Sequence, residues 1–185
     1  RVLLAAGDLT RSIDPSGVHL WWGDEGFAPT GHSDRNDTAV AHALRSLVPA
    51  ANLHPVSGPD RVDTVQASAN AYAEELARLG AGSAAPRFDV VLLGVGPDGH
   101  VASLFPGHPA LEAPGTTVAV TDSPKPPPQR VSLTRGAIDG ARQVWLLGSG
   151  QEKAGAVAAA LGGADLPCAR VHGESTLWLL DLDAA

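Results

Sequence analysis

The sequence predicts an α/β protein with a mostly parallel central sheet, helices on both faces and a Rossmann-like architecture. Two observations lead to this prediction. Segments of strand type alternate along the chain with segments of helix type, and most strand segments are continuous apolar runs. Strands that are apolar on both faces need helices on both faces of the sheet. The 185 residues suffice for one such core, so residues 1–185 are expected to form a single domain.

The expected strands are short apolar runs, most of which end at glycine or aspartate. Residues 18–23 (VHLWWG) and 88–96 (FDVVLLGVG) are typical of buried strands, whereas residues 51–56 form a shorter run. The full set of expected strands is 18–23, 51–56, 88–96, 116–122, 143–148 and 175–181.

The expected helices lie between these strands. Residues 34–48 place alanine and leucine at helical spacing behind polar capping candidates, and residues 63–80 join good helix formers to a terminal glycine. Residues 150–163 are bracketed by glycines and predict a third helix. The opening RVLLAAGDL (1–9) reads as a helix entered midway and has no methionine, so we expect a preceding segment to belong to the domain.

The loops that follow the strands are the expected place for a site. Ligands of open α/β sheets bind beyond the carboxyl ends of the strands. Four segments follow expected strand ends: 23–29, 94–100, 122–130 and 148–153. We expect these four loops to share one edge of the sheet and to carry the chemistry.

Composition narrows the possible partners. A formal charge of −7 argues against nucleic acid and anionic membranes, although a few well-placed cations can still bind a small anionic substrate. Cys168 is the sole cysteine, which excludes a disulfide framework within the chain and fits a reducing cytoplasm. No apolar run approaches the ~18 residues of a membrane span. We expect a cytoplasmic monomer or small homo-oligomer.

The glycines at 94, 96 and 99 spell G-x-G-x-x-G, the pattern of a dinucleotide-binding turn. That function needs a helix to begin at the third glycine, so that its N-terminus meets the pyrophosphate. The prolines at 106, 109 and 114 leave at most a short helix over residues 101–105. The pattern therefore disfavours a nicotinamide cofactor.

The same loop is better suited to presenting His100. Gly96 and Gly99 permit backbone angles that other residues avoid, Pro97 stiffens the turn, and Asp98 can orient a neighbour. Histidine is the usual general base near neutral pH. The alternative is that His100 only caps or packs, but the strand-end position favours catalysis.

The stretch LGVGPDGHVASLFPGHPAL (93–111) resembles the signature of the 6-phosphogluconolactonase family. WWGDE (21–25), DSPKPPPQRVSLT (122–134) and GSGQEKA (148–154) agree with that family, so the resemblance covers nearly the whole chain. It implies hydrolysis of 6-phospho-D-glucono-1,5-lactone to 6-phosphogluconate in the oxidative pentose phosphate pathway. It implies no cofactor and no metal, and the seven histidines show no metal-ligand spacing.

The resemblance suggests catalytic roles for several residues. His100 matches the family's histidine and is the expected general base, while Asp98 and Gly99 shape its loop. Gly99 is also an expected contact of the substrate. Asp24 and Glu25 are expected to position the water or the sugar hydroxyls. Their alternative roles are helix capping or a solvated loop.

Cations are expected to hold the anionic substrate. Lys125 and Arg130, on the stiff Pro-rich loop, suit a phosphate or a lactone oxygen. Arg35 is expected to contact the substrate or, together with Asn36, to buttress the first loop, and capping is an equal possibility for Asn36. Lys153 could reach the same edge or lie exposed on its helix.

Two departures from the family pattern leave alternatives open. Gly26 stands where the family usually has arginine, either because ligand binding differs here or because a positive φ is needed. The family's Gly-Gly-Ser-Thr-type phosphate loop is absent from the chain. Two alternatives therefore stay open. One is a glucosamine-6-phosphate deaminase or isomerase, although those enzymes have a segment like AFNEPG where this chain has ASLFPG. The other is a non-catalytic sugar-phosphate-binding module.

Overall fold

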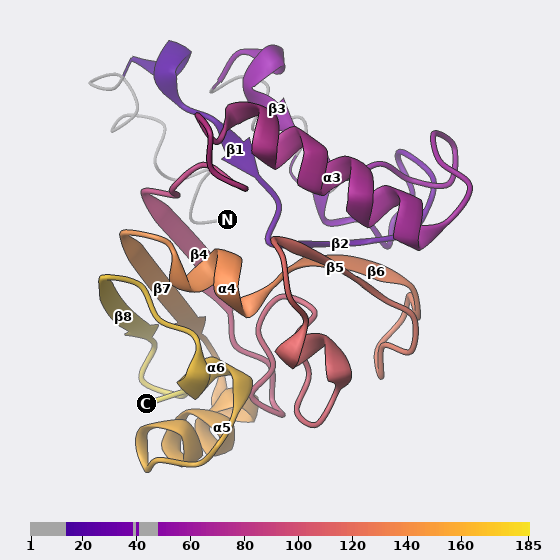
Figure 1. The fold of residues 1–185 in the computed structure, drawn as a ribbon. Helices are drawn as coiled ribbons and strands as arrows, with labels where there is room; N and C mark the ends of the chain where they lie inside the picture. Colours follow the sequence, from indigo (N-terminus) through magenta and orange to yellow (C-terminus); the bar gives the residue numbers. More distant parts are fainter. Residues whose placement is uncertain (1–13, 39, 41–47) are drawn as a thin grey trace.

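The computed structural model describes residues 14–38, 40 and 48–185, and its strands fall into three sheets (Figure 1). The strands are β1 (Leu20–Trp21), β2 (Asp24–Gly26), β3 (Leu53–His54), β4 (Val90–Gly94), β5 (Thr117–Val120), β6 (Arg130–Leu133), β7 (Gln143–Gly148) and β8 (Ser175–Leu180). The helices are α3 (Val65–Leu79), α4 (Arg135–Asp139), α5 (Gln151–Leu161) and α6 (Pro167–Arg170). Short 3-10 turns are η2 (Pro15–Gly17), η3 (Ala50–Asn52) and η4 (Pro109–Glu112). This is the predicted α/β class.

A parallel sheet with the strand order β4-β7-β8 forms the largest part of the predicted architecture. One of its faces is core, built from Val91, Leu93, Val144 and Leu146, none of which is more than 6% exposed. The opposite face is also apolar but remains 43–50% exposed at Val90, Leu92, Leu177 and Leu179. Helix cover on both faces, as expected for continuous apolar strands, is therefore incomplete among the described residues.

The expectation that residues 116–122 form another parallel strand is wrong. In a second sheet, with the order β2-β6-β5, both pairings are antiparallel. Only residues 121–129 connect β5 to β6, and a parallel crossover needs a dozen residues or more. A hairpin is the pairing that this short connection permits.

The strand expected over residues 18–23 is shorter in the structure, and a second strand follows it. Its centre is β1, which pairs in parallel with the two-residue β3, inside the expected strand 51–56. The chain then turns at Gly23 and continues as β2, so part of the expected loop 23–29 is a strand that pairs with β6. This change of sheet brings Asp24 beside the hairpin of β5 and β6.

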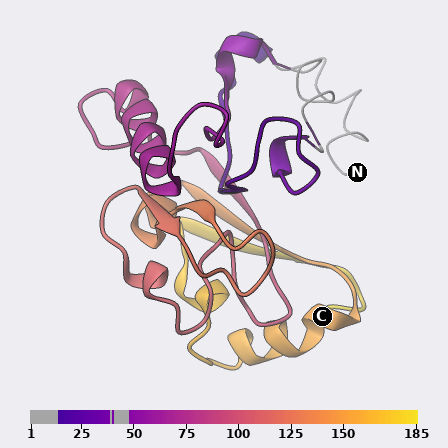
Figure 2. The ribbon, with the colours of Figure 1, turned by 90° about the vertical axis from the view of Figure 1, so that its right-hand side faces the viewer.

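Two of the expected helices are confirmed. Residues 63–80 contain α3, whose N-cap Thr64 accepts a hydrogen bond from the Ala67 backbone N–H at 3.0 Å, and residues 150–163 contain α5. Figure 2 shows α3 and α5 at opposite ends of the molecule, with strands between them. Residues 36–38 and 40 are helical, but most of the expected helix 34–48 lies outside the described residues, as does the opening 1–9.

Residues 101–105, where the prolines allow at most a short helix, form no helix in the structure. Val101 and Leu104 form an isolated antiparallel bridge, and Ala102 has a φ of 49°. Both Val101 and Leu104 are fully buried, so tertiary packing holds this segment as a tight turn. In the described part of the chain, every helix is too short or too polar to cross a bilayer.

Candidate active site

The loop after β4 presents His100 in a fixed orientation. Its imidazole Nδ1 lies 2.5 Å from Oδ1 of Asp98, and its ring packs against Phe105 in a tilted arrangement, with centroids 4.7 Å apart and 33° between the ring planes. The His100 side chain is 16% exposed. No described residue hydrogen-bonds to Nε2. With its proton on Nδ1 for Asp98, the neutral ring has a lone pair on Nε2 that can accept a proton.

The glycines of this loop are explained by the histidine, because a Cβ on Gly96 would overlap the His100 ring. Gly99 has a φ of 81°, and its N–H donates to the Gly96 carbonyl at 2.9 Å. The Gly96 N–H in turn donates to the His100 carbonyl at 2.9 Å. The G-x-G-x-x-G spacing therefore serves a closed turn that holds His100.

Lys125 joins the histidine from the hairpin connection. Its Nζ lies 3.4 Å from His100 Nδ1 and 3.7 Å from Asp98 Oδ1. Burial raises the pKa of the Asp98 carboxyl, but the hydrogen bond and charge of His100, together with the charge of Lys125, outweigh it, and the net shift is downward. Asp98 thus remains a carboxylate that orients both partners.

Asp24 connects a second cluster to the same loop. One carboxylate oxygen, Oδ2, accepts the Ser103 hydroxyl at 2.6 Å and the Arg130 Nη1 at 3.3 Å. The Asn36 side-chain amide donates to the Asp24 carbonyl at 2.9 Å. Ser103 is three residues after His100, so Asp24 ties the histidine loop to β2 and to the arginine of β6.

Arg130 is held from three sides. In addition to Asp24, its Nε donates to the Pro127 carbonyl at 3.2 Å and its Nη2 donates to the Pro126 carbonyl at 2.6 Å. The Arg130 side chain is 16% exposed, against 42% for Lys125. The two cations therefore differ: Arg130 is anchored, while Lys125 is freer to approach a ligand.

Glu25 and Arg35 support the first loop from within. Glu25 is fully buried, and its carboxylate accepts backbone N–H groups of Gly26, Asn36 and Asp37 at 2.6–2.8 Å. Burial raises the pKa of Glu25, although these hydrogen bonds and the nearby Arg35 oppose the shift. The geometry favours the capping alternative for Glu25.

The Arg35 guanidinium is likewise turned inward. It donates to the Asp37 carboxylate at 2.7 and 2.9 Å, to the Ala28 carbonyl at 3.1 Å and to the Val56 carbonyl at 2.7 Å. The residue is 2% exposed. Of its two expected roles, this environment favours buttressing over contact with a substrate.

The fourth loop stays apart from the cluster around His100. It starts beside the histidine loop, because the Val95 N–H donates to the Leu147 carbonyl at 2.9 Å. Lys153 pairs with Glu152 on its own helix at 3.2 Å, and Ser149 donates to Asp181 at 2.6 Å. Of the four loops that were expected to converge, three are therefore in direct side-chain contact.

Of the other histidines, His108 caps η4 by accepting the Ala110 N–H, while His32 and His172 are exposed. His54 is buried and bridges His19 and Glu75, and His42 lies outside the described residues. Among the described residues, no group of three or more His, Cys, Asp or Glu side chains could hold a metal ion.

Ser103 and Ser132 are site residues that the sequence analysis missed. Both are fully buried, and the Ser132 hydroxyl accepts the Ser103 N–H at 3.2 Å. The signal was a serine inside the apolar run VASLF, where a hydroxyl needs a partner.

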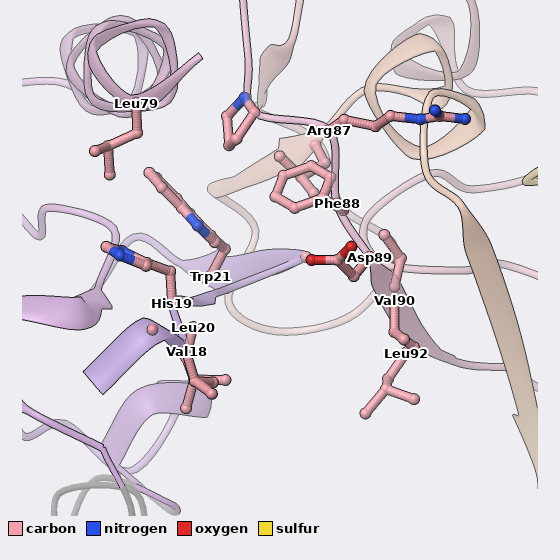
Figure 3. A pocket seen from close by; sticks show the side chains of 15 residues that line it. Val18, His19, Leu20, Trp21, Leu79, Arg87, Phe88, Asp89, Val90 and Leu92 are labelled. Carbon is pink, nitrogen blue, oxygen red and sulfur yellow. The ribbon is translucent and has the colours of Figure 1, made fainter. Parts of the chain in front are cut away.

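A cavity of about 770 Å³ lies away from these residues, between β1 and β4 (Figure 3). Leu20 and Trp21 line one side, and Phe88, Val90 and Leu92 line the other. The cavity is mainly apolar, and none of His100, Lys125 or Arg130 lines it. The convergent polar groups, not this volume, define the candidate site.

The fold and the site together define an α/β protein with a histidine–aspartate pair and two cations at the ends of its strands. The chain belongs to the family of glucosamine-6-phosphate isomerases and 6-phosphogluconolactonases, whose model matches residues 2–178. Similar proteins include the 6-phosphogluconolactonase of Streptomyces coelicolor, 49% identical over 98% of this chain and 74% of the relative. The 6-phosphogluconolactonase of Mycobacterium tuberculosis is 50% identical over 95% of this chain and 75% of the relative.

Solved structures agree with this assignment. The crystal structure of 6-phosphogluconolactonase from Thermotoga maritima has a TM-score of 0.83 at 27% identity and covers 96% of this chain and 79% of its own. A monomeric glucosamine-6-phosphate deaminase has a TM-score of 0.77 at 20% identity, covering 100% of this chain and 80% of its own, which shows a shared fold.

Proposed function

We propose that this protein hydrolyses 6-phosphogluconolactone to 6-phosphogluconate, a step of the oxidative pentose phosphate pathway. The observation that carries the proposal is His100, held by Asp98 on Nδ1 and without a described partner on Nε2. The names of the relatives that share about half of their residues with this chain support the same activity. The lactone is an ester, so its hydrolysis needs a general base, support for an oxyanion and cations for the phosphate.

In the proposed reaction, Nε2 of His100 removes a proton from water as the water oxygen attacks the lactone carbonyl carbon. The carbonyl π electrons move onto oxygen and give a tetrahedral oxyanion. When this intermediate collapses, the bond to the ring oxygen breaks, and the imidazolium returns its proton to that oxygen. Asp98 stabilises the transient charge on His100 and fixes the ring. Because the imidazolium has given its proton to the ring oxygen, no net proton remains on the enzyme.

The two cations divide the remaining work in this proposal. Lys125, which is the more exposed, faces His100 and is the group proposed to meet the phosphate or the developing oxyanion. Arg130 is anchored by Asp24 and by two carbonyls, so it supplies a fixed positive field at the floor of the site. Both cations are already near carboxylates, which keeps the empty site close to neutral.

The test is an assay of freshly generated 6-phosphogluconolactone, following loss of the lactone against its spontaneous hydrolysis. Glucosamine 6-phosphate serves as the control substrate, with release of ammonia as the readout. Lactone hydrolysis without ammonia release supports the proposal. Ammonia release would instead indicate the deaminase activity, and binding of 6-phosphogluconate without turnover would indicate a non-catalytic module.

A further inference from the structure

Gly26 lies against the Pro-rich connection that carries both cations. It is directly opposite Arg130 in the pairing of β2 with β6, and the next N–H, of Phe27, donates to the Gln129 carbonyl at 2.9 Å. A Cβ at position 26 would lie 2.8 Å from Pro127 Cγ and 2.9 Å from the Asp34 carbonyl oxygen. The ring of Pro127 therefore occupies the place where a side chain at position 26 would begin.

A positive φ does not explain this glycine, because Gly26 is absent from the residues with such backbone angles. The restriction is one of space. Atoms closer than about 3.0 Å to a Cβ have to move, and one of the two nearest here belongs to the backbone of Asp34. Any larger residue at position 26, including the arginine usual in the family, meets the same contacts.

The connection that rests on Gly26 is internally fixed, so a displacement at Pro127 is transmitted to its ends. Ser123 forms two hydrogen bonds within the connection. Its N–H donates to the Pro128 carbonyl at 3.0 Å, and its hydroxyl donates to the Lys125 carbonyl at 2.8 Å. The carbonyls of Pro126 and Pro127 accept the Arg130 guanidinium. Lys125 and Arg130 are thus carried by one hydrogen-bonded unit.

We infer that Gly26 is a positioning residue: the space left by its missing side chain seats Pro127 and thereby sets Lys125 and Arg130 relative to His100. The assignment of a phosphorylated lactone as substrate rests on the proposed function. The seating itself does not, since it concerns contacts between Gly26, Pro127 and the Asp34 backbone.

The experiment is a double-mutant cycle on the full chain with Gly26→Ala, Pro127→Ala and the double variant. Gly17→Ala is the matched control, because a Cβ there meets nothing within 4 Å. In the parent background, Gly26→Ala is expected to lower Tm and to raise KM for the phosphorylated lactone roughly tenfold, with a smaller effect on unphosphorylated gluconolactone. A misplacement of about 1 Å can cost on the order of 10²-fold, so an effect of this size is reasonable.

The double variant carries the decisive comparison. Pro127→Ala removes the ring atoms but leaves the Asp34 carbonyl, so adding Gly26→Ala to it should change KM much less than it does in the parent, and should lower Tm by only part of the loss seen in the parent. Additive effects on Tm, or a Gly26→Ala variant that melts and binds like the parent, overturn the inference. Equal losses on both lactones overturn the positioning of Lys125, the cation whose loss is expected to affect the phosphorylated lactone selectively. A parent without lactonase activity refutes the proposed function instead. The Tm values of the double-mutant cycle then still test whether Gly26 seats Pro127.

Discussion

His100 Nδ1 and Asp98 Oδ1 lie 2.5 Å apart, and Lys125 Nζ is within 3.7 Å of the same carboxylate oxygen. One carboxylate therefore orients the expected base and one of the cations. Because the pKa of Asp98 lies below its ordinary value of about 3.9, the residue stays ionised throughout the neutral range. Its contribution to stability is present above that value and is lost as the pH falls through the lower, folded-state pKa.

His100→Asn is expected to retain the fold and to lower kcat by about 10²- to 10⁴-fold, because the variant has no group that can accept the proton of water. Steady-state rates with the phosphorylated lactone measure the effect, and circular dichroism checks the fold. Asn at position 100 can still donate to Asp98, which makes it the conservative choice. A variant within a few fold of the parent would remove His100 from the mechanism.

Lys125→Ala and Arg130→Ala are expected to differ. Removal of Lys125 should raise KM for the phosphorylated lactone by about 10- to 100-fold, the equivalent of one charge-assisted contact of about 1.5–3 kcal/mol, with little change in Tm. Removal of Arg130 should also lower Tm and slow the hydrolysis of both phosphorylated and unphosphorylated lactones, because Asp24 and two proline carbonyls lose their contact with the guanidinium. Parallel assays and melts compare them. Identical profiles would contradict the division of work between the two cations.

Tyr72→Phe is expected to destabilise the protein by about 1–3 kcal/mol without changing the site chemistry. The Tyr72 hydroxyl accepts the Trp22 N–H at 2.8 Å and donates to the Trp22 carbonyl at 2.9 Å, in a buried position. Burial raises the pKa of Tyr72, so the phenol is neutral and can serve both groups. Urea unfolding monitored by fluorescence measures the change. An unchanged midpoint would mean that water replaces the hydroxyl.

His54 is expected to make stability depend on pH. Burial lowers its pKa below the unfolded value of about 6.5, although the hydrogen bond to Glu75 opposes the shift. Its ring also contacts His19 at 2.9 Å and stacks on Trp21 at 3.9 Å, and Arg78 binds the same Glu75. As the pH falls below about 6.5, the unfolded chain binds the proton first, so this contribution to stability declines toward the folded-state pKa.

Chemical unfolding at several pH values between 5 and 8 tests this expectation, with His54→Gln compared with the exposed His32→Gln. The slope of unfolding free energy against pH below about 6.5 should flatten in the His54 variant and persist in the His32 variant. A slope unchanged in His54→Gln would assign the dependence to other groups.

The parts of the structure that could be predicted are those set by local sequence. The apolar runs predict β4, β7 and β8, and the loop of glycines around Asp98 predicts an oriented His100. The antiparallel direction of β5 was missed because it depends on the length of the nine-residue connection to β6, not on the composition of β5 itself. The roles of Glu25 and Ser103 depend on neighbours distant in sequence, so residue type alone could not separate a buried cap from a group that faces the substrate.

The pairing of β2 with β6 has a consequence for how the protein folds. Asp24 and Arg130 meet although they are 106 positions apart in the chain, whereas β4, β7 and β8 follow one another more closely. Closing a long loop costs entropy before any contact repays it, so pairings over long separations tend to form late. During refolding, the secondary structure of the parallel sheet should therefore recover before catalytic competence, because the arginine reaches its place only at the last closure.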